Sequence, residues 1–184
     1  MGTDNSRFYE KVKLRLKAIA EIPKDEVSIL ECYAGKGLLY AEVKKHTSKK
    51  LHIVSIEKEK GKNPFALCGD NLKFLPTLDL EKFDIIDLDA YGIPSEQIKI
   101  IADRGWHGGL VATCITQRLG WGRCPNILLK KINAVKIARK VPTLFAPYLF
   151  QLFEHFLFSF GVRQKKGYYF NEQSGYKHYF YCKI

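Results

Sequence analysis

The stretch that most limits the possible folds is residues 27–37, Val-Ser-Ile-Leu-Glu-Cys-Tyr-Ala-Gly-Lys-Gly. An apolar, β-branched run ends in the acid Glu31, and a turn of small residues then leads into a helical pattern that begins near Leu38. This order predicts a buried parallel strand that delivers a glycine loop into a helix. Such a unit opens α/β folds of the nucleotide-binding type.

Spacing separates the ligand classes that use a loop of this kind. A phosphate-binding P-loop has the order Gly-x-x-x-x-Gly-Lys-Ser/Thr, but Leu30 and Gly37 stand at its first and last positions here. A dinucleotide fingerprint needs a third small residue, and Tyr40 occupies that place. An acid at the strand end with two nearby glycines suits S-adenosylmethionine (SAM), which has a charged amino-acid end and no phosphate. We therefore expect SAM as the cofactor.

Strand-like and helical segments alternate along the first two thirds of the chain, which indicates βαβ units and a parallel sheet. The tail differs: residues 117–141 are basic and interrupted by glycine, an aromatic helix follows over about 143–160, and 168–182 reads as a hairpin. We expect strands at 27–31, 51–56, 66–68, 83–89 and 110–115, and helices at 6–21, 38–46, 71–78 and 95–103, with Ser6 and Ser95 as caps.

A mostly parallel α/β sheet finished by an antiparallel hairpin is the Rossmann-like architecture of class I SAM-dependent methyltransferases. No repeat or low-complexity tract divides the 184 residues. We expect one domain over 1–184, in which residues 1–26 are an N-terminal helix, 27–116 the cofactor-binding core, and 117–184 a basic and aromatic substrate-side region with the hairpin.

In such a fold, ligands bind at the carboxyl ends of the strands. Glu31 would face the ammonium of SAM, Glu57 would accept hydrogen bonds from the ribose hydroxyls, and Asp70 would contact the adenine amine. Glycines in the loop let the backbone approach the cofactor. The predicted cofactor-binding residues are Glu31, Tyr33, Gly35, Gly37, Glu57, Asp70 and Asp87.

The loop after the fourth strand, Asp89-Ala90-Tyr91-Gly92, resembles the Asp/Asn-Pro-Pro-Tyr/Phe loop of methyltransferases that act on planar amino groups. An exocyclic amine is a poor nucleophile because its lone pair is delocalised into the base. Asp89 and the Ala90 carbonyl could accept its two hydrogens and stabilise the developing charge, and Tyr91 could stack on the base. We predict catalytic roles for these three residues; the alternative is that Asp89 only caps the strand and Tyr91 belongs to the core.

Residues 27–116 resemble the catalytic domain of the tRNA guanine-N2 methyltransferase family. The resemblance rests on Glu31 to Gly37 and on Asp87-Leu88-Asp89-Ala90-Tyr91-Gly92, where the family typically has a sequence close to Asp-Ile-Asp-Pro-Phe-Gly. Ala90 departs from the family's proline. The resemblance implies N-methylation of a base, with RNA favoured over DNA as the substrate.

The net charge of the chain also favours a nucleic-acid partner. Thirty Lys and Arg stand against nineteen Asp and Glu, which gives a formal charge of +11. A surface of this kind accumulates polyanions. The basic residues cluster at Lys44, Lys45, Lys49 and Lys50, at Lys130, Lys131, Lys136, Arg139 and Lys140, and at Arg163, Lys165 and Lys166.

Other classes of protein are disfavoured. No apolar run reaches the roughly 18 residues of a membrane span, and polar residues interrupt the longest candidate, 144–160. The five cysteines form no C-x-x-C pair, so we expect buried free thiols in a cytoplasmic protein. The histidines and cysteines lack metal-ligand spacing, so we predict no metal site.

Two further interpretations of the sequence stay open. The same fold could methylate a protein or a small molecule instead of a nucleic acid. Alternatively, the chain could be a non-catalytic nucleic-acid-binding protein with a vestigial methyltransferase fold, and Ala90 is the feature that favours this interpretation. The sequence does not indicate an oligomeric state.

Overall fold

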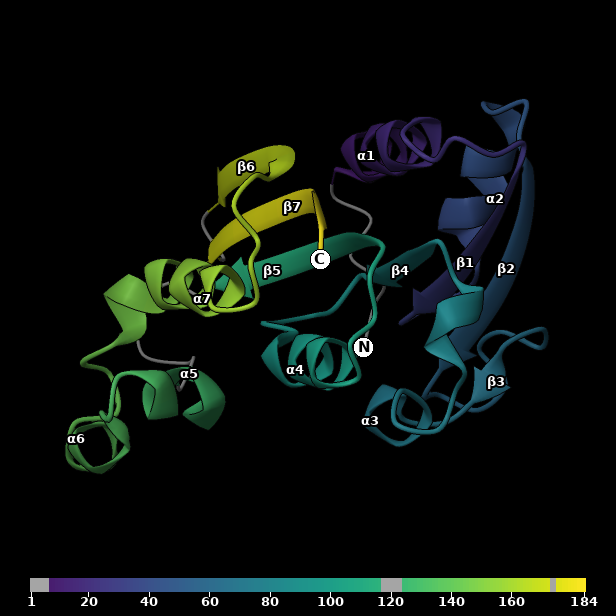
Figure 1. Ribbon diagram of the computed structural model, residues 1–184. Coiled ribbons are helices and arrows are strands. Elements are labelled where there is room, and N and C mark those ends of the chain that lie inside the picture. The colour runs from purple at the N-terminus through teal and green to yellow at the C-terminus, as the bar shows by residue number, and fades with distance from the viewer. Residues whose placement is uncertain (1–6, 117–123, 173–174) are drawn as a thin grey trace.

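A computed structural model describes residues 7–116, 124–172 and 175–184, and they build one seven-stranded sheet (Figure 1). The strand order is β3-β2-β1-β4-β5-β7-β6. The first five strands are parallel, and β7 runs antiparallel to both β5 and β6. The strands are β1 Glu26–Cys32, β2 Lys50–Glu57, β3 Leu67–Cys68, β4 Ile85–Leu88, β5 Gly109–Thr116, β6 Lys166–Glu172 and β7 Gly175–Lys183.

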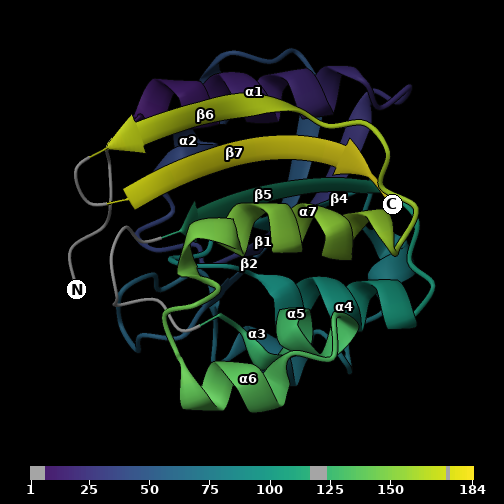
Figure 2. The ribbon, with the colours of Figure 1, turned by 90° about the vertical axis from the view of Figure 1, so that its left-hand side faces the viewer.

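Helices cover both faces of this sheet. Helices α1 and α2 lie on one face, and α4, α5 and α7 lie on the other (Figures 1 and 2). Helix α6 lies beyond α5, on the side away from the sheet. The α-helices are α1 Phe8–Ala20, α2 Leu38–Lys45, α3 Asn71–Phe74, α4 Ser95–Asp103, α5 Asn126–Lys131, α6 Val135–Lys140 and α7 Leu149–Phe158; short 3₁₀ turns are Leu80–Lys82 and Ala146–Tyr148.

The two helical layers produce two apolar cores, one on each face. Successive side chains of a strand point to opposite faces, so Ile29 of β1 joins the core beneath α1 and α2, whereas Leu30 joins the other. The core beneath α4, α5 and α7 also holds the fully buried Trp106, Phe153 and Phe156. Because both faces are covered, β1 reads as a nearly continuous apolar run in the sequence.

The predicted fold class is confirmed: the sheet is mostly parallel and ends in an antiparallel hairpin. Two helices are shorter than predicted, and proline accounts for both. Helix α3 ends at Phe74, directly before Leu75 and Pro76, because Pro76 has no N–H with which to continue the helical hydrogen bonds. Helix α7 begins at Leu149, after a 3₁₀ turn that contains Pro147, which has no N–H to donate.

The predicted cap of α4 is wrong. Ser95 is the first residue of the helix, Pro94 occupies the capping position, and no side-chain cap hydrogen bond forms there. Ser6, the predicted cap of α1, lies outside the described residues. Arg7, in a left-handed conformation with φ 61°, precedes the first turn of α1.

Within residues 7–116, 124–172 and 175–184, none of the helices combines the length and the apolar composition needed to cross a bilayer.

Candidate functional site

The strand register places a row of polar side chains across the middle of the sheet. Glu31 on β1 pairs with Ser55 on β2 and with Asp87 on β4. Residues paired in this way point to the same face of the sheet, and here that face is the one covered by α1 and α2. Asp89 follows two positions after Asp87. The row therefore reaches the carboxyl ends of the strands, where open α/β sheets bind ligands.

The glycine loop after β1 contains left-handed backbone conformations and forms hydrogen bonds to β2. Gly35 and Gly37 have φ angles of 57° and 74°, a region that glycine enters without steric cost. The Gly35 N–H donates to Oε2 of Glu57 over 2.7 Å, and the Ala34 N–H donates to the Ile56 carbonyl over 3.0 Å. Oε1 of Glu57 accepts the Glu59 N–H at 3.0 Å. Glu57 thus fixes the loop through its backbone.

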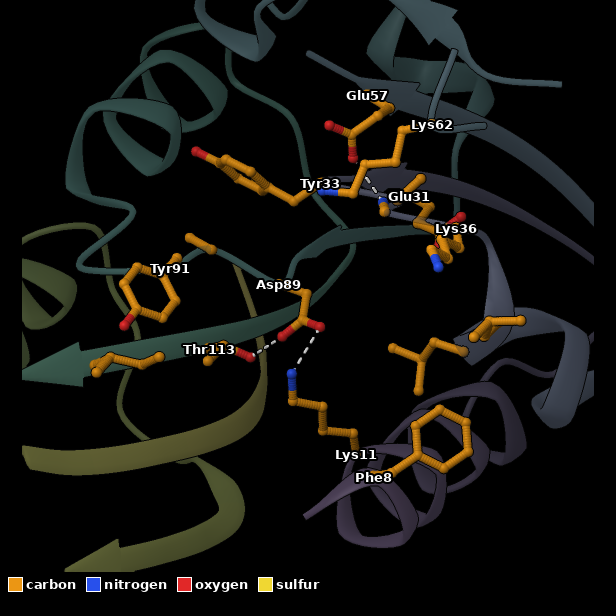
Figure 3. Close-up of a pocket in the computed structure, with 16 residues that line it drawn as sticks. Phe8, Lys11, Glu31, Tyr33, Lys36, Glu57, Lys62, Asp89, Tyr91 and Thr113 are labelled. Atoms are coloured by element: carbon orange, nitrogen blue, oxygen red, sulfur yellow. Dashed lines mark hydrogen bonds and ion pairs between the residues drawn. The ribbon is translucent and has the colours of Figure 1, made fainter. Parts of the chain in front are cut away.

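A cavity of about 340 Å³ opens beside this loop (Figure 3). Its walls come from the glycine loop, the ends of β2 and β5, the loop after β4 and the first turns of α1 and α2. Three carboxylates line it, those of Glu31, Glu57 and Asp89. The predicted site residues that the structure brings to this cavity are Glu31, Tyr33, Gly35, Glu57, Asp89, Ala90 and Tyr91.

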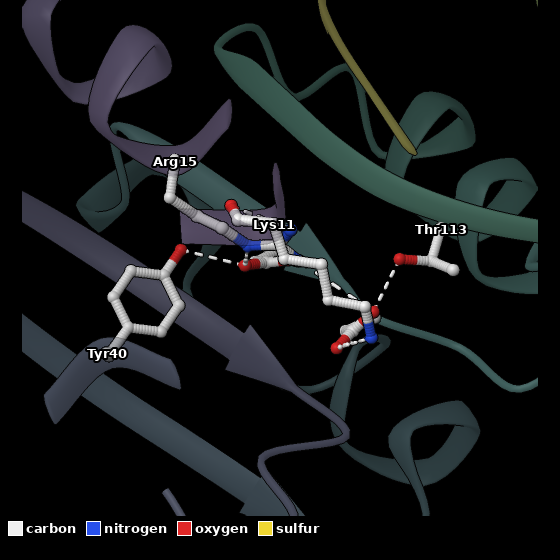
Figure 4. Close-up of polar contacts among 6 residues, drawn as sticks. Lys11, Arg15, Tyr40 and Thr113 are labelled. Atoms are coloured by element: carbon white, nitrogen blue, oxygen red, sulfur yellow. Dashed lines mark hydrogen bonds and ion pairs between the residues drawn. The ribbon is translucent and has the colours of Figure 1, made fainter. Parts of the chain in front are cut away.

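Asp89 is held by partners from two other elements. One carboxylate oxygen accepts from Nζ of Lys11 at 2.9 Å, and the other accepts from the Thr113 hydroxyl (Figures 3 and 4). The Arg15 guanidinium lies 3.9 Å from the second oxygen. Burial alone would raise the pKa of Asp89, but the cations of Arg15 and Lys11 outweigh it and hold this pKa below its ordinary value. The group therefore stays a carboxylate, oriented and charged, at the cavity wall.

Asp87, one of the predicted cofactor-binding residues, does not line the cavity. Its side chain is fully buried, and Arg15 binds it in a fork with distances of 2.8 and 2.7 Å. The Tyr40 hydroxyl donates a third bond over 2.8 Å (Figure 4). Burial would lower the pKa of Arg15, but the attraction of Asp87 outweighs it, so this pKa is raised. Asp87 is a buried ionic anchor for α1.

Glu31 is part of the cavity wall and is also paired in the sheet with the buried Asp87. It is nearly buried, lines the cavity and accepts a hydrogen bond from the Ser55 hydroxyl over 2.7 Å. Burial raises the pKa of Glu31 to about 7, and the negative charge of Asp87 adds to this effect. Near neutral pH the side chain is therefore poised between its acid and its carboxylate form.

The loop after β4 exposes the ring of Tyr91, and backbone hydrogen bonds fix the conformation of the loop. Tyr91 is 69% exposed and lines the cavity, so the alternative that this ring belongs to the core is wrong. The Ala90 N–H donates to the Leu88 carbonyl over 2.8 Å, and the Gly92 carbonyl accepts from the Ile115 N–H at 2.9 Å. A proline at position 90 could not make the first of these bonds. Alanine at this position therefore has a structural use.

Two other predicted cofactor residues do not line the cavity. Asp70 caps α3 by accepting the Leu72 N–H at 3.0 Å and pairs with Lys58 at 3.0 Å. These contacts explain the acid at this position without a ligand. Gly37 is the capping residue of α2, and a Cβ there would lie 3.1 Å from Nδ2 of Asn63. Both positions shape the surroundings of the loop.

Sequence reasoning missed the contribution of α1. Phe8 and Lys11 of this helix line the cavity, as do Lys36, Lys62 and Thr113 (Figure 3). A usable signal did exist, because Lys11 and Arg15 lie on one helical face four residues apart, and Asp87 and Asp89 lie on one strand face two residues apart. Within the described parts of the chain, no group of three His, Cys, Asp or Glu is arranged to hold a metal ion.

The sequence matches no protein-family model, and it matches no curated protein. Solved structures with the same fold are nevertheless numerous. Magnesium protoporphyrin IX methyltransferase from Synechocystis PCC 6803, with bound SAM, has a TM-score of 0.57 at 11% identity and covers 97% of this chain and 78% of its own. The plantazolicin methyltransferase BamL, with S-adenosylhomocysteine, gives 0.53 at 11% identity over 97% of this chain and 85% of that one.

A third example is an N-methyltransferase from Haemonchus contortus, in complex with phosphomonomethylethanolamine and S-adenosylhomocysteine. It has a TM-score of 0.56 at 8% identity and covers 95% of this chain and 52% of its own. At these identities the likeness establishes the fold. The chain thus has the Rossmann-like fold of class I SAM-dependent methyltransferases.

Proposed function

We propose that this protein is a SAM-dependent methyltransferase that methylates an exocyclic amino group of a nucleic-acid base, with RNA favoured over DNA. The observation that carries the proposal is the cavity at the carboxyl ends of the parallel strands, where the glycine loop, Glu31, Glu57 and Asp89 meet. The fold, shared with methyltransferases that hold SAM or S-adenosylhomocysteine, supports the cofactor. The loop resemblance to the tRNA guanine-N2 methyltransferase family supports the acceptor.

Glu31, Glu57 and the glycine loop would bind the cofactor. Glu31 would face the ammonium of its methionine part. Each Glu57 oxygen already accepts one backbone N–H, and a carboxylate oxygen has a second lone pair that can accept from a ribose hydroxyl. The left-handed Gly35 keeps a Cβ out of the space beside the loop. When bound, SAM supplies the electrophilic methyl group.

Asp89, Ala90 and Tyr91 would bind the acceptor base. Lys11 and Thr113 fix the Asp89 carboxylate, which lines the cavity, and each of its oxygens has a second lone pair to which the amine could donate. A charged acceptor held in advance stabilises the positive charge that grows on nitrogen during transfer. The exposed Tyr91 ring offers a stacking surface. Positioning of the amine opposite the methyl group would supply most of the rate.

The test is transfer of a labelled methyl group from SAM to RNA, followed by mass analysis of the nucleosides. We expect Asp89→Asn to lower turnover by about 10²- to 10³-fold, because it removes one preorganised electrostatic contact. Its affinity for SAM, measured by calorimetry, should stay close to that of the wild type. Tyr91→Ala, a change at an exposed ring, should instead raise KM for RNA.

Two results would contradict this proposal. If the wild type binds SAM but labels no nucleoside, the acceptor is not a nucleic-acid base. If Asp89→Asn is folded, binds SAM and turns over normally, then Asp89 does not hold the amine. Thermal unfolding of each variant provides the control for folding.

A small anionic molecule is the second candidate acceptor, and the cavity lysines favour it. Lys36 lines the cavity and is exposed, and the described residues offer its ammonium no carboxylate partner. Lys11 and Lys62 line the same cavity, although each pairs with an acid, Asp89 and Glu59 respectively. Methylation of a carboxylate- or phosphate-bearing small molecule, with no RNA methylation, would select this candidate.

A further inference from the structure

The positive charge of the chain is concentrated in one segment outside the cavity. Residues 104–153 contain eight Lys or Arg and no Asp or Glu. Within it, residues 126–148, which we name the basic arm, comprise α5, α6 and the turn before α7. No residue of the basic arm lines the cavity. Its five cations are Lys130, Lys131, Lys136, Arg139 and Lys140, and all five are exposed.

The base of the arm is anchored in the core, whereas α6 makes a shallower contact through the partly buried Val135 and Ala138. Leu128 and Leu129 of α5 and the following Ala134 are buried in the core. Helix α6, in contrast, has no buried residue. Both ribbon views place it on the outer side of α5, away from the sheet (Figures 1 and 2). Packing of these two side chains does not account for the three cations on the rest of the helix.

The three charges of α6 share one face of the helix. Lys136, Arg139 and Lys140 are related by three and four positions, which brings their side chains together on a helix surface. Like charges at this spacing repel each other by about 0.2–0.5 kcal/mol per pair. In the part of the chain that the structure describes, none of the five cations of the arm forms an ion pair. Lys131 instead lies over the Phe160 ring, 5.3 Å from its centroid.

We propose that the basic arm is the surface that recruits the nucleic-acid substrate, with the cationic face of α6 on its phosphates. The inference rests on the proposed function and locates the contact outside the cavity. A row of phosphates matches three adjacent cations, because each neutralised phosphate releases a counterion. Binding of these phosphates also relieves the repulsion between the cations of α6.

An anionic membrane is the competing occupant, because exposed apolar side chains accompany the charges. An interfacial helix presents a large continuous apolar face to lipid. Helix α6 contributes only Ile137 to such a face, at 52% exposure. The other exposed large apolar side chains of the arm lie outside the α-helices, at Ile132, Val141, Leu144 and Tyr148. The charge arrangement is the more regular feature, and it favours the polyanion.

The experiment measures binding of a labelled single-stranded RNA by fluorescence anisotropy over a range of salt concentrations. It compares the full chain with the triple variant Lys136→Gln, Arg139→Gln and Lys140→Gln. The matched control is Lys58→Gln, Lys82→Gln and Lys99→Gln, which removes the same charge from three lysines that are paired with Asp70, Asp79 and Asp103.

We expect the arm variant to lose about tenfold or more in RNA affinity at low salt, and its log–log salt slope to fall by about 2, at about 0.7 per phosphate contact. The control variant should stay within about threefold of the wild type, since distant surface charges are screened. In methylation assays the arm variant should raise KM for RNA and leave kcat and SAM affinity unchanged.

Equal losses in both triple variants would overturn the proposal, because net charge would then be the determinant. So would wild-type RNA binding by the arm variant. Arm-dependent binding to phosphatidylserine vesicles, with no arm-dependent RNA binding, would assign the arm to a membrane instead. Anisotropy measures RNA binding by the arm and does not require methylation. A failure of the proposed methylation is therefore distinguishable from a failure of this inference.

Discussion

Glu31 shows how one residue can link the electrostatics of the fold to the proposed chemistry. It sits in a polar row between Ser55 and Asp87, nearly out of contact with water. Burial raises its pKa to about 7, while its proposed partner, the ammonium of SAM, needs the carboxylate form. Binding of the cofactor would therefore release a proton from this site.

This linkage predicts that SAM affinity depends on pH. Between pH 5.5 and 7, affinity should rise by up to about tenfold per pH unit as Glu31 loses its proton, and it should level off above pH 7. Titration calorimetry in buffers of different ionisation enthalpy measures both affinity and proton release. Glu31→Gln should bind more weakly at pH 7.5 and should lose the pH dependence. A wild-type affinity that is flat from pH 5.5 to 7.5 would show that Glu31 does not face the cofactor.

The raised pKa of Glu31 also makes the folding stability of the SAM-free protein depend on pH. This stability falls as the pH rises, whereas the affinity for SAM increases. The folded pKa of Glu31 lies above its ordinary value of 4.5, so the folded state holds the proton more tightly than the unfolded chain does. The stabilising contribution is complete below pH 4.5 and is lost as the pH rises to about 7. Relative to Glu31→Gln, the wild type should lose about 3 kcal/mol of unfolding free energy across this window.

At the scale of elements, α1 is the part that completes the site. Lys11 and Arg15 of this helix hold Asp89 and Asp87 at the end of β4, and Phe8 and Lys11 line the cavity. Two lysine side chains of α1 also lie over rings of the hairpin, Lys11 over Tyr179 at 5.4 Å and Lys17 over Tyr168 at 5.2 Å. The helix thus connects the cavity to the far end of the sheet.

We expect Arg15→Met to destabilise the protein by about 3–5 kcal/mol, because it leaves the Asp87 carboxylate buried without its cation. Denaturant unfolding followed by circular dichroism measures this loss. The matched control is Lys13→Met, which changes an exposed lysine on the same helix and should cost less than about 0.5 kcal/mol. The double change Arg15→Met with Asp87→Leu should recover stability, since it removes both buried charges. Equal stability of the two single variants would contradict an anchoring role for the pair.

The sequence predicted elements better than it predicted contacts between them. Strands β1, β2, β4 and β5 and the final hairpin follow from local apolar patterns, and the glycine loop follows from the spacing of Gly35 and Gly37. The partners of Asp87 and Asp89 did not follow, because they lie 72 and 78 positions away in the chain. The spacing of the two cations and of the two acids shows that each pair shares a face, but local patterns do not indicate that α1 lies over β4. An acid at a strand end looks the same in sequence whether it meets a ligand, an arginine, as Asp87 does, or a helix N-terminus, as Asp70 does.

At the scale of the whole molecule, the sheet is continuous through β7, which bonds to β5 along eight residue pairs and to β6 along seven. We propose that residues 1–184 form one domain. Calorimetry should then show a single unfolding transition in which the calorimetric and van't Hoff enthalpies agree. SAM at about 100 times its dissociation constant should stabilise the folded state by about 2.7 kcal/mol. Two resolved transitions, with only one shifted by SAM, would indicate two domains.

The position of β7 also has a consequence for biosynthesis. It is the last strand along the chain, yet it lies inside the sheet, between β5 and β6. While the chain is being translated, the β5 edge therefore stays unpaired until residues 175–183 have left the ribosome. An open, apolar strand edge is a template for pairing with other chains, and nascent chains at this stage are prone to misassembly. Ribosome stalling within β7 should thus expose an aggregation-prone intermediate in which the parallel strands β1 to β5 are already in place.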